Sequence, residues 1–296
     1  MFWTIRFGKK QRILAAICAG ILCVSGVLYA ADQPRASDAG DPLSGGVSLP
    51  IIMYHGLLKE EARQGAYVIS PVLFEEDLLY IQQHGYTTIV MQDLLDYVQG
   101  GKPLPEKPIM LTFDDGYYNN YVYAFPLLKK YGQKIVLSPI GRFADEYTQS
   151  GDLKPNYAHI PWPLLRDMVD SGLVEVQNHT YNMHSPTASP RKGAQKMKGE
   201  TSEQYRQSLE QDIGRMQQRM EEELGAKATT FTYPFGAVSP ESVPILREMG
   251  FEATLVCESH LNRITRDPAC LYGLGRYLRA SGMSAEQFFT QKLKLA

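Results

Sequence analysis

Short apolar runs alternate with longer amphipathic stretches from residue 49 almost to the end of the chain, and this alternation constrains the fold most strongly. The runs Leu49–His55 and Pro108–Phe113 predict buried strands, because each is short and is bounded by polar or turn-forming residues. Ser70 followed by Pro71 predicts a helix start, since serine caps helices and proline suits their first turn. Strands that alternate with helices indicate an α/β fold with a parallel sheet, and the number of units favours barrel-like closure.

The same pattern predicts elements along the rest of this region. We expect further strands at residues 87–90, 134–138, 174–177, 229–233 and 253–256, and helices at 70–83, 91–98, 121–131, 161–171, 202–224, 240–249 and 284–294. Residues 143–159 are interpreted as a polar insertion between two of these elements.

Polar residues stand just after several of the predicted strands. His55, Asp114 and Asp115 each follow an apolar strand, and His179 follows the strand predicted at 174–177. In barrels built from parallel strands, the chemistry lies at the carboxyl ends of the strands. The sequence therefore predicts that these side chains share one site.

The N-terminus differs in character from the remainder of the chain. Basic residues between Arg6 and Arg12 precede an uncharged apolar run at 13–31, which predicts either a signal peptide or an uncleaved anchor helix. Both alternatives place the bulk of the chain outside the cytoplasm, either membrane-anchored or secreted. Residues 32–48, rich in Gly, Ser, Asp and Pro, predict a flexible linker, so that the domain itself comprises residues 49–296.

The charge balance and the cysteines narrow the class of protein. The net charge is -2, without an arginine-rich stripe, so nucleic acid is not an expected partner. Cys257 and Cys270 lie in the exported part, where a disulfide is permitted, and the sequence leaves open whether they pair or stay free. We expect a monomer.

Two carboxylates and two histidines form the predicted chemical centre. Asp114 and Asp115 precede Gly116, so a turn can bring both carboxylates to one rim, although Asp-Asp-Gly is also an ordinary turn sequence. His179 and His184 are five residues apart, which places them on a loop and not on one helix face. Two histidines and one carboxylate form a ligand set that leaves metal positions open for water and substrate. An ion held there would polarise an acyl oxygen and lower the pKa of the attacking water.

These motifs carry a resemblance to a known family. Residues 49–260 resemble the polysaccharide deacetylase family, also described as the NodB-homology domain or carbohydrate esterase family 4. The block from Ile109 to Tyr117 is similar to the first motif of that family, and the block from Val176 to His184 is similar to its second. The segments Met53–His55 and Ser70–Phe74 are most similar to the bacterial group that includes poly-β-1,6-N-acetylglucosamine deacetylases.

The resemblance implies a fold, a cofactor and a role for each site residue. The implied fold is a distorted (β/α) barrel, and the implied cofactor is a divalent metal, most often zinc, with iron, cobalt, nickel or manganese as alternatives. Asp115, His179 and His184 would hold the metal, while Asp114 would be the general base that takes a proton from the attacking water.

The third family motif concerns the acyl oxygen. Tyr233–Gly236 is similar to that motif, which implies that the backbone N–H of Phe235 stabilises the oxyanion of a tetrahedral intermediate. Tyr117 follows the first motif, and it either lines the substrate groove or packs against its neighbours.

The sequence departs from the family pattern at two points. Thr232 stands where the family has an arginine that orients the base, and the usual C-terminal Leu-x-x-His, which supplies the general acid, is not visible. His55 is the candidate for a site-lining residue and for the acid, whereas His260 is interpreted as structural. Arg276 and Arg279 are the candidates to replace the missing arginine.

The sequence therefore predicts a metal-dependent hydrolase that removes N-acetyl groups from a cell-surface or extracellular polysaccharide containing N-acetylglucosamine. An esterase for O-acetyl groups of xylan or a related glycan would use the same metal and water. A glycan-binding protein without turnover is the third alternative, and the missing arginine and acid histidine favour it. The sequence names neither the glycan nor the metal.

Overall fold

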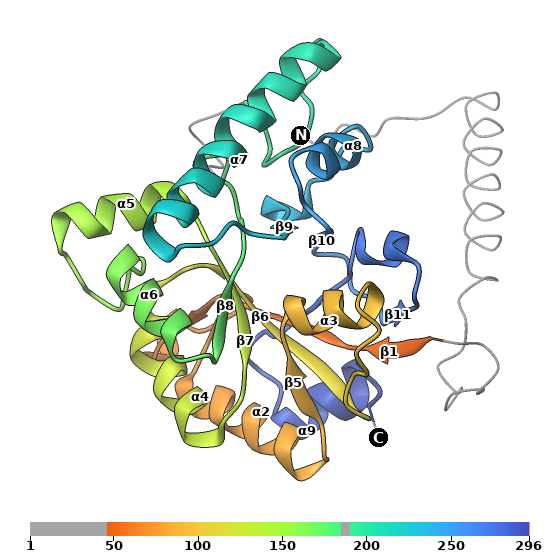
Figure 1. Ribbon diagram of the computed structural model, residues 1–296. Helices are drawn as coiled ribbons and strands as arrows, with labels where there is room; N and C mark the ends of the chain where they lie inside the picture. The colour runs from red at the N-terminus through yellow and green to blue at the C-terminus, as the bar shows by residue number, and fades with distance from the viewer. Residues whose placement is uncertain (1–45, 185–189, 296) are drawn as a thin grey trace, which may run out of the picture. The chain divides into compact units, whose positions relative to one another are not determined.

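The computed structural model describes residues 46–184 and 190–295 (Figure 1). The apolar run at 13–31 and nearly all of the predicted linker lie outside these residues. Within the described ranges, no helix has both the length and the hydropathy that crossing a bilayer requires. Cleavage or anchoring of the N-terminus therefore stays a prediction from the sequence.

Short strands make up the sheets. They are β1 (Val47–Leu49), β2 (Ile51–Tyr54), β3 (Gly56–Leu57), β4 (Val68–Ile69), β5 (Thr87–Ile89), β6 (Pro108–Asp115), β7 (Ile135–Pro139), β8 (Val174–Val176), β9 (Thr230–Thr232), β10 (Ala253–Leu255), β11 (Asn262–Ile264) and β12 (Tyr277–Leu278).

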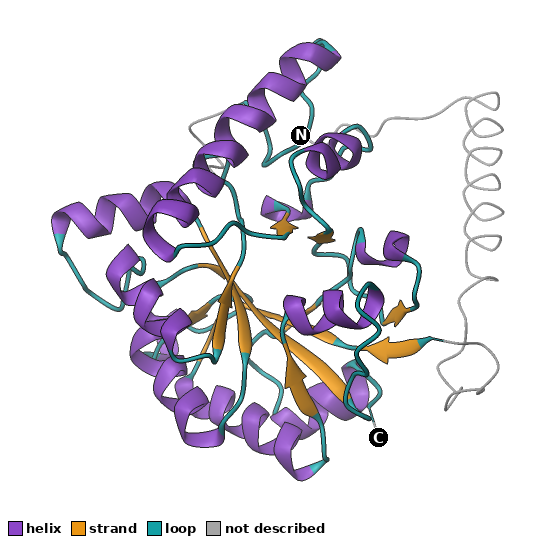
Figure 2. Ribbon diagram, viewed as in Figure 1, coloured by secondary structure: helices purple, strands orange, loops and turns teal. Residues whose placement is uncertain are grey.

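Helices cover the outside of the strands (Figure 2). They are α2 (Pro71–Gln83), α3 (Met91–Val98), α4 (Phe125–Tyr131), α5 (Gly141–Ser150), α6 (Trp162–Asp170), α7 (Ser202–Leu224), α8 (Ser242–Glu248) and α9 (Ala285–Gln287), with short 3-10 or π turns η1 (Glu61–Arg63), η2 (Asn120–Ala124), η3 (Pro234–Gly236), η4 (Pro268–Leu271) and η5 (Phe288–Lys292).

The parallel strands close into a distorted ring. The main sheet has the order β12-β2-β6-β7-β8, with β5 also paired to β6, and β9 and β10 form a separate parallel pair. Two isolated parallel bridges join the two sheets, from Asn178 beyond β8 to Phe231 in β9, and from Leu255 in β10 to Leu274 ahead of β12. The barrel-like closure expected from the sequence is therefore present, with single bridges where a regular barrel would have full strand pairing.

The core lies on both faces of the central strand β6. Successive strand residues point to opposite faces, so Leu111 and Phe113 join the cluster beneath α2, α4, α6 and α7, while Met110 joins a second cluster with α3 and β10. Burial on both faces explains why β6 is apolar up to Phe113 except for Thr112, whose buried hydroxyl donates to the carbonyl oxygen of Ile52.

Most predicted elements are confirmed, and three differences bear on the site. Residues 143–159 are not a simple insertion, because α5 begins at Gly141 and continues to Ser150. The short strands β11 and β12 were not predicted. The strand predicted to end at Phe113 continues through Asp115, which carries both carboxylates into the sheet.

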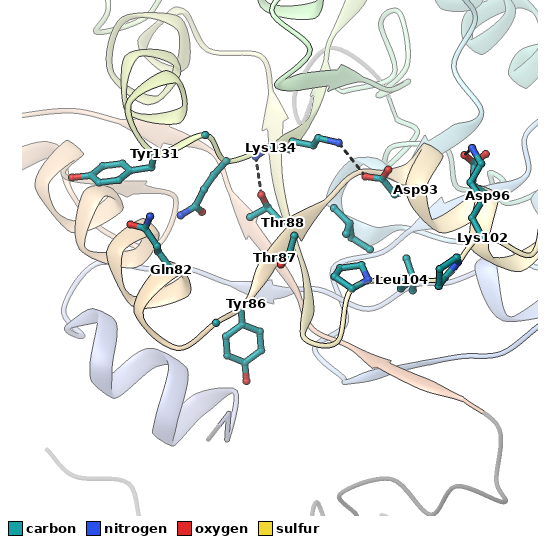
Figure 3. Close-up of a pocket in the computed structure, with 16 residues that line it drawn as sticks. Gln82, Tyr86, Thr87, Thr88, Asp93, Asp96, Lys102, Leu104, Tyr131 and Lys134 are labelled. Carbon is teal, nitrogen blue, oxygen red and sulfur yellow. Dashed lines mark hydrogen bonds and ion pairs between the residues drawn. The ribbon is translucent and has the colours of Figure 1, made fainter.

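A pocket of about 570 Å³ lies at the opposite end of the sheet from these carboxylates (Figure 3). Thr87 in its wall pairs with Pro108, the first residue of β6, whereas Asp115 is the last. Lys134 in the same wall donates from its backbone to the hydroxyl of Thr88 at 2.8 Å. The pocket therefore has no part in the site described next.

Candidate metal centre and active site

Residues with a strained, positive φ lie at or close after the ends of three strands. Among the described non-glycine residues, φ is positive at Asp115 (68°), Thr180 (72°) and Phe235 (58°), and otherwise only at Lys294. The first three follow or end β6, β8 and β9. Residues hold such a conformation only where their surroundings enforce it, and they often do so at functional sites. Gly116 continues the turn at φ 72°, and a Cβ there would lie 2.6 Å from that of Pro139, so only glycine fits.

Asp115, His179 and His184 converge on one point. One ligand atom from each residue lies within 4.8 Å of the other two. The Oδ1 atom of Asp115 lies 3.6 Å from Nε2 of His179 and 3.3 Å from Nε2 of His184. The predicted ligand set is thus brought together in space, with the histidines on the loop that the five-residue spacing indicates.

The donor atoms of this cluster fit a divalent metal. Oδ1 of Asp115 is buried and accepts no hydrogen bond, a costly arrangement for a carboxylate unless a cation occupies the space beside it. Nδ1 of His179 donates to the carbonyl oxygen of Thr232 at 2.8 Å, which leaves the lone pair of Nε2 facing Asp115. Burial acts to raise the pKa of Asp115, but the neighbouring histidines outweigh it and hold this pKa low, so the carboxylate is ionised.

Asp114 stays outside this cluster and is held by an arginine. The two terminal nitrogens of Arg276 donate to its two oxygens at 2.7 and 2.8 Å. Both side chains are buried, and Arg276 also donates to the carbonyl oxygen of Val256 and to the hydroxyl of Thr112. Burial acts to raise the pKa of Asp114, but Arg276 and the adjacent histidines lower it further than burial raises it.

The sequence offered Arg276 and Arg279 as candidates to replace the family's arginine, and Arg276 is the one that contacts Asp114. Arg279 is excluded from this contact, because it forms its own buried pair with Asp77 of α2. Thr232, at the family's arginine position, uses its hydroxyl for a 2.8 Å hydrogen bond with Ser138. The arginine that contacts Asp114 thus comes from the position just ahead of β12, and not from the motif position.

His55 reaches the same site from the end of β2. Its Nδ1 is buried without a hydrogen-bond partner, and the exposed Tyr67 ring lies 4.9 Å away, centroid to centroid. Burial lowers the pKa of His55, opposed by the charges of Asp114 and Asp115, so the imidazole is neutral at neutral pH in the metal-free protein. No pattern in the sequence had pointed to Tyr67.

Tyr117 lies on the other side of Asp115 and packs against a histidine that the sequence did not single out. The rings of Tyr117 and His159 are 4.9 Å apart, and Phe143 stacks on His159 at 4.3 Å. Burial and the charge of Asp115 raise the pKa of the Tyr117 phenol, which therefore stays protonated. Tyr117 packs, as one of the two expectations had it, and its lining of a substrate groove stays a prediction.

Phe235 and the remaining candidates occupy defined places. The Phe235 ring is 37% exposed and lies 4.3 Å from the ring of His184, at the rim of the cluster. His260 packs over Gly275, where an added Cβ would lie 2.4 Å from the imidazole, in agreement with a structural role. Cys257 and Cys270 are free thiols.

Comparison with known proteins agrees with this geometry. The family model for polysaccharide deacetylase matches residues 101–254. The poly-β-1,6-N-acetyl-D-glucosamine N-deacetylase of Escherichia coli (strain K12) is 26% identical over 257 residues, which cover 81% of this chain and 38% of that protein. The chain thus spans well under half the length of this curated relative.

Solved structures share the fold. A de-N-acetylase from Aggregatibacter actinomycetemcomitans is 26% identical with a TM-score of 0.69, covering 82% of this chain and all of that one. IcaB from Ammonifex degensii is 30% identical with a TM-score of 0.66, covering 80% of this chain and 94% of that one. The α/β ring, the two motif blocks and these matches lead to one conclusion: the chain belongs to the polysaccharide deacetylase family.

Proposed function

We propose that this protein removes N-acetyl groups from a polysaccharide that contains N-acetylglucosamine, and that it acts outside the cytoplasm. The observation that carries the proposal is the pairing of a buried Asp-His-His cluster with a second, separately held carboxylate. Asp115, His179 and His184 converge on one point, while Asp114 beside them is fixed by Arg276.

Asp115, His179 and His184 are the residues that would hold a divalent metal, with zinc the first choice for this donor set. When bound, the ion supplies a Lewis acid that polarises the acyl carbonyl and lowers the pKa of the attacking water.

Asp114 is the general base. The fork of Arg276 engages both of its oxygens, yet a carboxylate has about four lone-pair sites, so acceptor capacity remains for a proton from water. The fork also fixes the plane of the carboxylate, and base catalysis requires the oxygen within hydrogen-bond reach of the proton it removes. Because Arg276 is fully buried, water cannot compete for this contact.

His55 is the candidate for the acid that protonates the leaving nitrogen: its imidazole is neutral in the resting protein, so it would first take up the proton that Asp114 removes from water and then pass it to the amine nitrogen. Its partnerless Nδ1 and its position beside both carboxylates support this role. Collapse of a tetrahedral amide adduct expels an amine, which leaves poorly unless its nitrogen gains a proton. The backbone N–H of Phe235 would donate to the acyl oxygen as negative charge develops there, and the protonated Tyr117 would line the groove.

Arg276 also bears on the alternative of a binding protein without turnover. That alternative was supported by the threonine at position 232, where the family has an arginine. Arg276 contacts Asp114 from another part of the chain and would take the place of that arginine. A second carboxylate that is not a metal ligand can act as a base in hydrolysis, whereas simple glycan binding does not require one. An esterase acting on O-acetyl groups uses the same constellation and is separated by experiment.

The test is acetate release by the full chain loaded with zinc. Matched substrates are β-1,6-linked N-acetylglucosamine oligomers, chitin oligomers, peptidoglycan and an O-acetylated xylan. We expect release from at least one N-acetylated glycan and a much slower reaction with the xylan ester. Release from the ester alone would replace the amidase by an esterase, and no release from any of them would support the binding protein.

A further inference from the structure

The loop that carries both histidines requires support beyond the metal. Four residues separate His179 from His184, and the first of them, Thr180, has a φ of 72°, in the left-handed region that threonine rarely adopts. Such a conformation costs roughly 1–3 kcal/mol and persists only where neighbouring groups hold it. The contacts of residues 180–182 show what holds it here.

One side of the loop is fastened to the start of α5. The amide of Gly141 donates to the carbonyl oxygen of Thr180 at 3.1 Å, and that of Arg142 donates to the carbonyl oxygen of Tyr181 at 2.8 Å. Gly141 permits this approach, since a Cβ there would lie 2.8 Å from the Tyr181 ring. These two hydrogen bonds use the carbonyl oxygens of Thr180 and Tyr181. The backbone amides of the loop need acceptors of their own.

The other side is held by a single carboxylate from α7. Oδ1 of Asp212 accepts from the amide of Tyr181 at 2.8 Å, and Oδ2 accepts from the amide of Asn182 at 2.9 Å. Two consecutive backbone donors therefore converge on one anion, which makes both hydrogen bonds charge-assisted. Asn182 stands two residues before His184, so this contact fixes the direction in which the chain approaches the second histidine.

The position of Asp212 on α7 explains how its carboxylate reaches the loop. The buried face of α7 includes Leu209, Ile213 and Met216, and Asp212 lies at its edge. Arg215 on the next turn places its guanidinium 3.7 Å from the centroid of the Tyr181 ring. Aspartate is a weak helix former in a helix interior, so its contacts with the loop, and not its helix propensity, account for its place there.

We propose that Asp212 is a positioning residue for the metal centre, which aligns His179 and His184 with Asp115 by binding the amides of Tyr181 and Asn182. This inference rests on the metal site of the proposed function. Groups that orient metal ligands typically contribute about 10- to 100-fold to metal affinity. Loss of the carboxylate leaves two backbone amides without their acceptor and lets Thr180 leave its left-handed conformation. Metal binding must then restore the loop conformation that aligns the two histidines, and this costs free energy.

The experiment compares four forms of the full chain: wild type, Asp212→Asn, Asp212→Glu and Glu210→Gln. Glu210 lies on the same helix, forms an ion pair with Arg206 and is exposed, so its variant makes the same charge change away from the loop. Zinc dissociation constants are measured by competition with a chromophoric chelator. Hydrogen–deuterium exchange over residues 178–184 and thermal unfolding are followed in the metal-free proteins.

We expect Asp212→Asn, which presents an NH2 group to one of the amides, to bind zinc about 10- to 100-fold more weakly and to exchange faster in this segment. Glu210→Gln should match wild type. Asp212→Glu keeps two acceptor oxygens and should recover part of the affinity, and it replaces the asparagine variant if that one does not fold.

Two results would overturn the inference. If both Asp212 variants bind zinc as tightly as wild type, the loop does not depend on this carboxylate. If thermal stability falls while zinc affinity stays at the wild-type value, Asp212 is a packing residue only. Failure of the wild type to bind zinc is a separate outcome, because it contradicts the proposed function itself.

Discussion

Arg276 binds both oxygens of Asp114 through its two terminal nitrogens, at 2.7 and 2.8 Å, although the two residues are 162 positions apart in the chain. The contact exists because β12 pairs with β2 and β2 pairs with β6, which brings the C-terminal segment close to β6, and the long side chain of Arg276, just ahead of β12, reaches Asp114 from there. Arginine forms such a two-pronged contact and lysine cannot, because only the guanidinium presents two parallel donors. The orientation of Asp114 therefore depends on the C-terminal segment that leads into β12.

Arg276→Lys should lower kcat by at least about tenfold while zinc affinity stays within a factor of about two, because the charge remains but the plane of Asp114 is no longer fixed. Arg279→Lys is the matched control, since Arg279 forms an equally buried pair with Asp77 away from the site. Both variants should lose stability, and only the first should lose turnover selectively. Equal kcat in the two variants would contradict the role given to Arg276.

His55→Gln should lower deacetylation of an N-acetylated glycan by about 100-fold or more, since a positioned general acid typically contributes about 10²- to 10⁴-fold. Hydrolysis of p-nitrophenyl acetate should fall far less, because its leaving group departs without a proton. The measurement is kcat on both substrates at full zinc occupancy. Equal losses on amide and ester would mean that His55 acts on something other than the leaving group.

Tyr67→Ala should raise KM for glycan oligomers several-fold with little change in kcat. The ring is 59% exposed and lies beside His55, where a pyranose ring entering the site can cover its apolar face. Tyr157→Ala removes another exposed aromatic ring, 46% exposed, whose hydroxyl donates to Asp152, and should leave KM unchanged. Parallel changes in the two variants would argue against a sugar contact at Tyr67.

His159 gives the metal-free protein a predicted sensitivity to acid. Burial lowers the pKa of this histidine from 6.5 to about 4. Between these values the unfolded chain binds a proton that the folded chain does not, so the free energy of unfolding falls as the pH drops from 6.5 towards 4. The loss is about 3 kcal/mol at most, at about 1.4 kcal/mol for each pKa unit.

His159→Gln removes this proton uptake. Denaturant unfolding of wild type and variant, with a chelator present, should therefore show a flatter dependence of stability on pH for the variant between pH 7 and 4. A wild type and variant that lose stability in parallel over this range would show that other groups, and not His159, account for the acid sensitivity.

Much of the fold follows from local pattern. The helix α7 has the bounds predicted from its long polar, helical stretch, and in the structure Thr201 caps its first turn and Gly225 ends it in the left-handed conformation. The helix α5 was missed because its exposed polar residues resemble a loop and because it begins at a glycine. The strand β12 has only two residues, too few for any periodicity to register.

The candidate site, like the fold, could be predicted from the sequence only in part. The Asp-His-His cluster could be predicted because Asp115 and His179 follow predicted strands and all three residues lie within family motifs. The contacts of Arg276 with Asp114 and of Asp212 with the histidine loop could not, since they form only through the closure of the ring and the packing of α7. The strain at Asp115 was likewise invisible, because nothing in Asp-Asp-Gly distinguishes a strained strand end from an ordinary turn.

The most direct test of the central claim is acetate release from β-1,6-linked N-acetylglucosamine oligomers by wild type and Asp114→Asn, each with its zinc content measured. The account predicts one zinc ion in both proteins, release by the wild type, and a loss of about 100-fold or more in the variant. Equal turnover by the two proteins would contradict Asp114 as the base. Zinc-loaded wild type that releases no acetate from these or other N-acetylated glycans would contradict the deacetylase itself.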